Sequence, residues 1–157
     1  MLNINSKAGY SVDSSFFIQL KNNVPINHYP SVWNKIKDYI DSGRFISPQP
    51  VYDELMKRSD DLNKWLSKNK DTMFTPIDDL LELTKQISKD YSDLIESTSD
   101  TEVADPYVIA LAIKARRNVL TIESKLGKVN IPYVCDQMNV PCVKKLGEFY
   151  VVENWNI

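Results

Sequence analysis

The chain is poor in the residues that several common kinds of functional site require. It has two cysteines, one histidine and four glycines among 157 residues. A single histidine excludes a histidine-rich zinc site or a two-histidine proton relay within this chain. The glycines are not spaced as a loop that cradles phosphate. Cys135 and Cys142 match neither a redox pair nor a zinc knuckle, so we expect two buried, reduced thiols.

The sequence also lacks long apolar runs and an excess of basic residues. No run approaches the roughly 20 apolar residues that span a bilayer, and the first residues lack the apolar segment of a signal peptide. We therefore predict a cytoplasmic protein without a membrane partner. Lys and Arg number 19 against 21 Asp and Glu, a net charge of −2. This balance argues against a broadly basic surface for nucleic acid, but it allows an acidic metal site beside local basic patches.

Short apolar segments alternate with segments of helical spacing. Residues 10–13, 44–47, 119–122 and 141–143 predict strands, with a weaker extended segment at 73–76. Helices are predicted from residue 16 and over 30–42, 51–58, 60–66, 77–91, 106–117 and 131–139. This alternation predicts an α/β protein, a three-layer α/β/α sandwich around a mostly parallel twisted sheet. We expect a single domain over residues 1–157, with residues 1–9 as a flexible arm.

The apolar segment 149–152 has two interpretations. Its residues favour an edge strand or a tail that packs on the surface. It could contribute to a homodimer surface or to the core, and the sequence leaves both open.

Four acidic residues are expected at one edge of this sheet. Asp13 and Glu123 end predicted strands, and Glu54 and Asp105 lie on helices that pack beside those strands. The carboxyl ends of parallel strands meet at one edge, where ligands of α/β proteins bind. Carboxylates gathered there repel one another, and a divalent cation relieves that repulsion. The pattern therefore predicts a metal site.

Each acid also has a purely structural interpretation. Asp13 suits a turn or a helix cap, and Asp105, directly before a proline, suits a helix N-cap. Glu54 lies at the border of the inward face of its helix, so we expect it to be half-buried, whereas Asp53 points to solvent. Lys57, three residues further on, is a candidate salt-bridge partner of Glu54.

The same residues resemble the motifs of the PIN-domain nuclease superfamily, which includes VapC-like toxins. The resemblance rests on four segments and spans residues 10–150: YSVDSSF at 10–16, Glu54 in a helix after a proline, ADPYVIALA at 104–112 and TIE at 121–123. An Ile-Ser-Pro strand before the Glu54 helix and Ile-Pro-Tyr-Val-Cys at 131–135 most resemble an uncharacterised bacterial PIN-like subfamily.

The resemblance implies a metal-dependent endoribonuclease that hydrolyses phosphodiester bonds of single-stranded RNA, the toxin of a toxin–antitoxin pair. It implies Mg²⁺ or Mn²⁺ held by Asp13, Glu54, Asp105 and Glu123. The superfamily most often has aspartate in place of Glu123, so Asp136 is a second candidate for the fourth acid. Ser14 could contact phosphate or a metal-bound water, or could cap its helix.

Substrate would also need cations. Arg116, Arg117, Lys125 and Lys128 are candidates for contacts to the RNA backbone, although each also fits an ordinary solvated charge. Two other functions share this fold class. A non-catalytic binding or assembly module would use the acids only as caps and surface charge. A phosphatase-like enzyme would favour an aspartate two residues after Asp13, where this chain has a serine.

Overall fold

The computed structural model describes residues 4–94, 103–123 and 129–157. Within this part of the chain five strands form one sheet in the order β3-β2-β1-β4-β5, and every neighbouring pair is parallel. The strands are β1 (Tyr10–Val12), β2 (Phe45–Pro48), β3 (Phe74–Thr75), β4 (Asn118–Leu120) and β5 (Cys142–Val143). The α/β class and the five predicted strand segments are confirmed.

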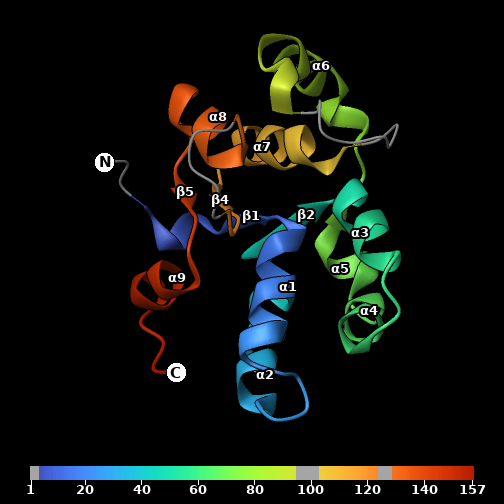
Figure 1. The fold of residues 1–157 in the computed structure, drawn as a ribbon, viewed down its shortest axis with the longest axis vertical. Coiled ribbons are helices and arrows are strands. Elements are labelled where there is room, and N and C mark those ends of the chain that lie inside the picture. The colour runs from blue at the N-terminus through green and yellow to red at the C-terminus, as the bar shows by residue number, and fades with distance from the viewer. Residues whose placement is uncertain (1–3, 95–102, 124–128) are drawn as a thin grey trace.

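Helices cover both faces of the sheet (Figure 1). On one side lie α6, α7 and α8, and on the other lie α1, α2 and α9, with α3, α4 and α5 beside the β2–β3 edge. This is the predicted three-layer sandwich. The helices are η1 (Ser6–Ala8), α1 (Ser14–Asn23), α2 (Pro30–Asp41), α3 (Gln49–Met56), α4 (Asp61–Ser67), α5 (Lys70–Met73), η2 (Asp78–Leu80), α6 (Leu81–Asp90), η3 (Ser92–Leu94), α7 (Ala104–Ala115), α8 (Ile131–Gln137) and α9 (Leu146–Glu153).

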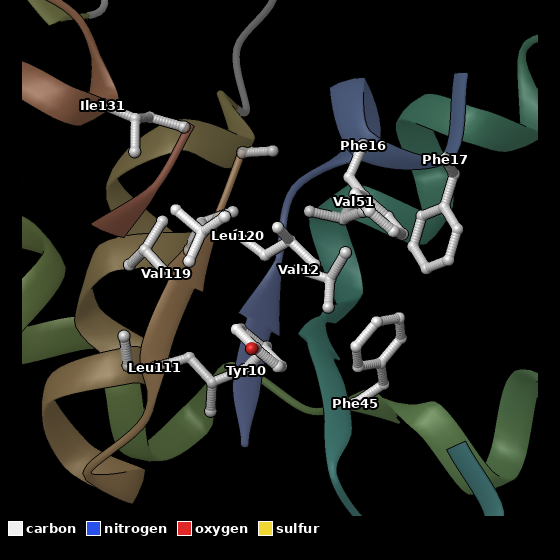
Figure 2. Packing of buried hydrophobic residues seen from close by; sticks show 14 of the residues in the cluster. Tyr10, Val12, Phe16, Phe17, Phe45, Val51, Leu111, Val119, Leu120 and Ile131 are labelled. Atoms are coloured by element: carbon white, nitrogen blue, oxygen red, sulfur yellow. The ribbon is translucent and has the colours of Figure 1, made fainter. Parts of the chain in front are cut away.

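The central strand β1 faces a different kind of neighbour on each side. The Tyr10 ring meets Phe45 and Phe149 edge to face, with centroids 5.7 and 5.6 Å apart. The next residue, Ser11, faces the other layer and donates its hydroxyl to the Val108 carbonyl of α7 at 2.8 Å. A small polar residue lets α7 pack closely, as the two-residue period of a strand allows. Figure 2 shows the buried residues around this strand, among them Val12, Phe16, Phe17, Val51, Leu111, Val119, Leu120 and Ile131.

The prediction of an edge strand at residues 149–152 was wrong, because they lie in helix α9. Phe149 is fully buried against the core. The last residue of α9, Glu153, has a side chain only 3% exposed, and its carboxylate accepts hydrogen bonds from Tyr10 and Tyr39 at 2.5 Å and from Arg44 at 2.7 Å. These contacts anchor a helix in a segment whose local β-propensity favours a strand. Val151 is 81% exposed, so the helix is only partly in the core.

Residues 4–9, in the segment expected to be a flexible arm, make defined contacts with the sheet, and the flexibility of the arm stays a prediction. Ser6–Ala8 form the short 3-10 helix η1. Asn118 donates its side-chain amide to the Asn5 and Gly9 carbonyls at 2.7 and 3.0 Å, and Arg44 donates to the Ser6 carbonyl at 2.9 Å. Polar groups at the start of two strands therefore hold this segment. Residues 1–3 lie outside the described part.

Two simpler predictions concern the cysteines and membrane helices. Cys135 and Cys142 are free thiols, the first buried and the second half-buried. None of the helices within the described ranges has the length and apolar character that crossing a bilayer requires.

Candidate functional site

The site is built where the two central strands end. In the parallel pair β1 and β4, Val12 lies opposite Leu120. The residues that follow, Asp13 and Thr121, therefore leave the sheet at the same carboxyl edge. The Asp13 amide donates to the Leu120 carbonyl at 2.9 Å, which holds the two chain segments together beyond the last paired residues.

Asp13 is buried, with 4% of its surface exposed. Its Oδ2 accepts hydrogen bonds from the Ser15 hydroxyl at 2.6 Å and the Thr121 hydroxyl at 2.9 Å. Asp13 occupies the N-cap position of α1, as one structural interpretation predicted, but within the described residues its side chain makes no capping hydrogen bond. Within the described residues no hydrogen bond falls on Oδ1, which leaves that oxygen for a ligand.

Sequence reasoning missed the hydroxyl network around Asp13. The Ser15 and Thr121 oxygens lie 3.1 Å apart, and the Ile122 amide donates to the Ser15 oxygen at 2.9 Å. This network fixes the carboxylate in one orientation relative to both strands. A signal was present, because Thr121 is a buried hydroxyl directly after an apolar strand and two residues before a candidate acid.

Glu54 reaches the same edge from α3. Its Oε1 accepts a hydrogen bond from the Ser14 hydroxyl at 2.6 Å, so Ser14 links the acid of α3 to the residue beside Asp13. We expected Glu54 to be half-buried, but it is exposed, as is Asp53. The physical reason is that the border of the inward face of α3 lies at the open rim of the sheet. The salt bridge between Glu54 and Lys57 stays a prediction.

Asp105 enters from the start of α7. The helix begins at Ala104 with Val103 as N-cap, so Asp105 lies in the first turn, and the N-cap interpretation was wrong. Burial raises the pKa of the Asp105 carboxyl, and the negative charges of Asp13, Glu123 and Glu54 raise it further, to about 8. The four predicted acids thus act on one another electrostatically. Burial is the largest cause of this rise in the Asp105 pKa, and the charges of the three other carboxylates add to it.

The two candidates for the fourth acid differ in position. Glu123 is half-buried and is among the three carboxylates that act on Asp105. Asp136 is exposed on α8 and is not among them. The arrangement therefore favours Glu123.

These acids fit a divalent cation in chemistry. Mg²⁺ and Mn²⁺ prefer oxygen ligands, and carboxylates that repel one another gain most from a shared positive charge. In the described part of the chain, no group of three or more Asp, Glu, His or Cys side chains is already arranged to hold a metal ion. Binding therefore requires these side chains to rearrange around the ion.

Of the predicted RNA contacts, the two that lie within the described residues, Arg116 and Arg117, are remote from this site. Arg116 and Arg117 follow the last turn of α7, whereas Asp105 lies in its first turn. A helix of 12 residues rises about 18 Å, so the two arginines lie towards the opposite edge of the sheet. Lys125 and Lys128 fall outside the described residues.

Comparison with known proteins gives a family but no activity. No curated protein matches the chain. A family model described as "Domain of unknown function (DUF4411)" matches residues 10–156, which is nearly the whole chain, and the protein belongs to that family.

Proposed function

We propose that this protein is a divalent-metal-dependent endoribonuclease of the PIN-domain superfamily. Its substrate would be single-stranded RNA, and its physiological role that of a cytoplasmic toxin restrained by a cognate antitoxin. One observation carries the proposal. Four acids come from separate segments of the chain, and three of them raise the pKa of the fourth, Asp105. They lie at the carboxyl edge of a parallel sheet, where α/β proteins bind their ligands.

In this proposal each acid has a separate task. Asp13, held by Ser15 and Thr121 through Oδ2, presents Oδ1 as a ligand of fixed direction. Asp105 offers a second ligand from the opposite layer of the sandwich. Hydrogen bonds that hold a metal-ligating carboxylate in one orientation favour a single coordination geometry.

Glu54 and Glu123 would complete the donor set from the rim. The Ser14 hydroxyl on Glu54 orients that carboxylate from α1. When bound, the cation would supply a water of lowered pKa and offset the charge that develops on the phosphate oxygens. The protein's part is to hold the carboxylate oxygens in place and to orient the scissile phosphate towards them. The negative charge of the carboxylates attracts the ion.

A cleavage assay with matched variants tests the proposal. Asp13→Asn removes one charge from the centre of the cluster, and Asp53→Asn removes one from the exposed face of the same rim. Asp53 contacts only Gln49 among the described residues, at 3.1 Å. With Mn²⁺ and single-stranded RNA we expect Asp13→Asn to lose at least about 100-fold in rate and Asp53→Asn to keep the wild-type rate. Full activity in Asp13→Asn would contradict the proposal.

The alternative is a non-catalytic binding or assembly module on the same fold. It gains some support because no set of acids within the described residues is prearranged for a metal ion. A thermal titration with Mn²⁺ distinguishes the two, because an ion that binds the folded state raises the thermal midpoint. We expect a rise in the wild type and in Asp53→Asn, and a smaller rise in Asp13→Asn. No rise at millimolar Mn²⁺ favours the module.

A further inference from the structure

A hollow lies at the edge of the sheet opposite the acid cluster. It encloses about 360 Å³, within the range of small-molecule sites. Its wall is formed by the end of α7, the start of β4, the connection from α8 to β5 and the N-terminal segment. We call it the amino-edge hollow. The acid cluster described above contributes no residue to it, so it is independent of the proposed nuclease function.

Two arginines line the amino-edge hollow without a carboxylate partner. Arg117 is half-buried, and its Nη1 donates to the Gly43 carbonyl at 2.6 Å. No acidic side chain in the described ranges forms an ion pair with either Arg116 or Arg117. Burial lowers the pKa of Arg117. A half-buried cation without a counter-charge is costly and favours an anion from outside.

Arg116, which lines the hollow, has an unusual backbone conformation. Arg116 ends α7 in the left-handed conformation, with φ of 56°, where glycine is the common residue. Asn139, also on the lining, has φ of 56°, and within the described part its side-chain amide makes no hydrogen bond. An exposed guanidinium and a free amide therefore stand beside the half-buried Arg117.

Two asparagines, Asn5 and Asn118, and six apolar residues form the rest of the lining. The apolar residues are Ile113, Met138, Val140 and Pro141, together with Ala8 and Ala112. A bare inorganic ion would leave this surface against water. A molecule with an anionic head and an apolar body would use both parts of the wall.

We propose that the amino-edge hollow binds a small organic anion, with a phosphate or carboxylate head held by Arg116 and Arg117 and an apolar body against Ile113 and Met138. Guanidinium groups form paired, charge-assisted hydrogen bonds with either head. Phenyl phosphate and benzoate distinguish a phosphate head from a carboxylate head.

Calorimetric titration of the whole protein with four probes tests the site at constant ionic strength. Phenyl phosphate and benzoate carry a head and a ring, inorganic phosphate carries only a head, and phenol carries only a ring. We expect at least one of the first two to bind more tightly than inorganic phosphate and more tightly than phenol. Binding of phenol equal to that of both anions, or no binding of any anion, would overturn the proposal.

Matched variants locate the site. Arg116→Asn keeps a residue that accepts the left-handed conformation, so the helix end is preserved while the charge is lost. Lys114→Asn removes the same charge from the exposed end of α7, outside the lining. We expect the dissociation constant of the tighter anion to rise about tenfold in Arg116→Asn and to stay unchanged in Lys114→Asn. Equal weakening in both variants would mean non-specific charge attraction and would refute the site.

Arg117 needs a milder change because it also supports the fold. Arg117→Gln retains an amide donor for the Gly43 carbonyl while removing the charge. We expect weaker anion binding with the thermal midpoint of the ligand-free protein close to that of the wild type. Wild-type affinity in Arg117→Gln would contradict the role of this guanidinium.

Discussion

At the scale of single residues, Gly9 shows how backbone conformation and close packing act together. Its φ is 81°, and a Cβ there would meet the Arg44 carbonyl oxygen at 2.7 Å as well as the Arg117 guanidinium. An L side chain is disfavoured in this conformation whatever the space. We expect Gly9→Ala to lower the free energy of unfolding by about 1–3 kcal/mol, measured by urea denaturation.

Gly147 is the matched control. It lies in α9, and a Cβ added there meets no atom within 4 Å. Alanine favours a helix over glycine by up to about 1 kcal/mol, so Gly147→Ala should leave stability unchanged or raise it. Equal destabilisation by both substitutions would show that the close approach at Gly9 has no energetic role.

Residue types also explain which parts of the site could be predicted from the sequence. Asp13 and Glu123 were placed at one edge because each follows a short apolar strand, and that step needs only the topology of a parallel sheet. The exposure of Glu54 could not be predicted, because a helical wheel gives the direction of a side chain but not where the neighbouring layer ends. The buried Glu153 was missed for a related reason. Its partners Tyr10, Tyr39 and Arg44 come from distant segments.

At the scale of elements, the same limits apply to strands and helices. The β1 and β4 strands could be predicted because short apolar runs are typical of strands in a parallel sheet, and both strands are indeed buried throughout. Residues 149–152 have a similar composition yet form a helix, because Phe149 and Glu153 lie one turn apart and both reach the core. Helix α7 was predicted two residues late, since Val103 takes the N-cap position without a side-chain cap.

The start of α4 offers a prediction about one element. Asp60 is its N-cap, and its carboxylate accepts from the Asn63 amide at 3.1 Å, from Lys21 at 2.9 Å and from Arg58 at 3.1 Å. Burial raises the pKa of the Asp60 carboxyl. The hydrogen bonds from Lys21, the Asn63 amide and Arg58 outweigh burial and lower that pKa to about 2.

Asp60→Asn separates the charge from the cap, because asparagine caps helices as well as aspartate does. The folded pKa lies below the ordinary value of 3.8, so the charge stabilises the fold above that pH, and its contribution is lost as the pH falls towards 2. We expect Asp60→Asn to lower the free energy of unfolding by about 1 kcal/mol near neutral pH and by clearly less near pH 2. A pH-independent difference in urea denaturation would contradict this account.

At the scale of the whole molecule, the acid cluster brings together negative charges from four segments of the chain, and these charges repel one another. The Asp105 pKa rises from 3.8 to about 8 in the folded protein, so the protonated form favours folding. The contribution of Asp105 to stability is complete below pH 3.8 and is lost as the pH rises through about 8. The thermal midpoint of the metal-free protein should therefore carry a component that falls across this window.

Asp105→Asn isolates that component and links it to metal binding. The amide carries no charge at any pH, so the metal-free variant should have a flatter pH profile and a higher thermal midpoint than the wild type near pH 8. Asp53→Asn, which removes a charge outside the cluster, should follow the wild type. Millimolar Mn²⁺ should reverse the order, because the wild type offers one more carboxylate to the ion. Parallel profiles of the wild type and Asp105→Asn, with and without Mn²⁺, would show that the four acids neither repel one another nor share a cation.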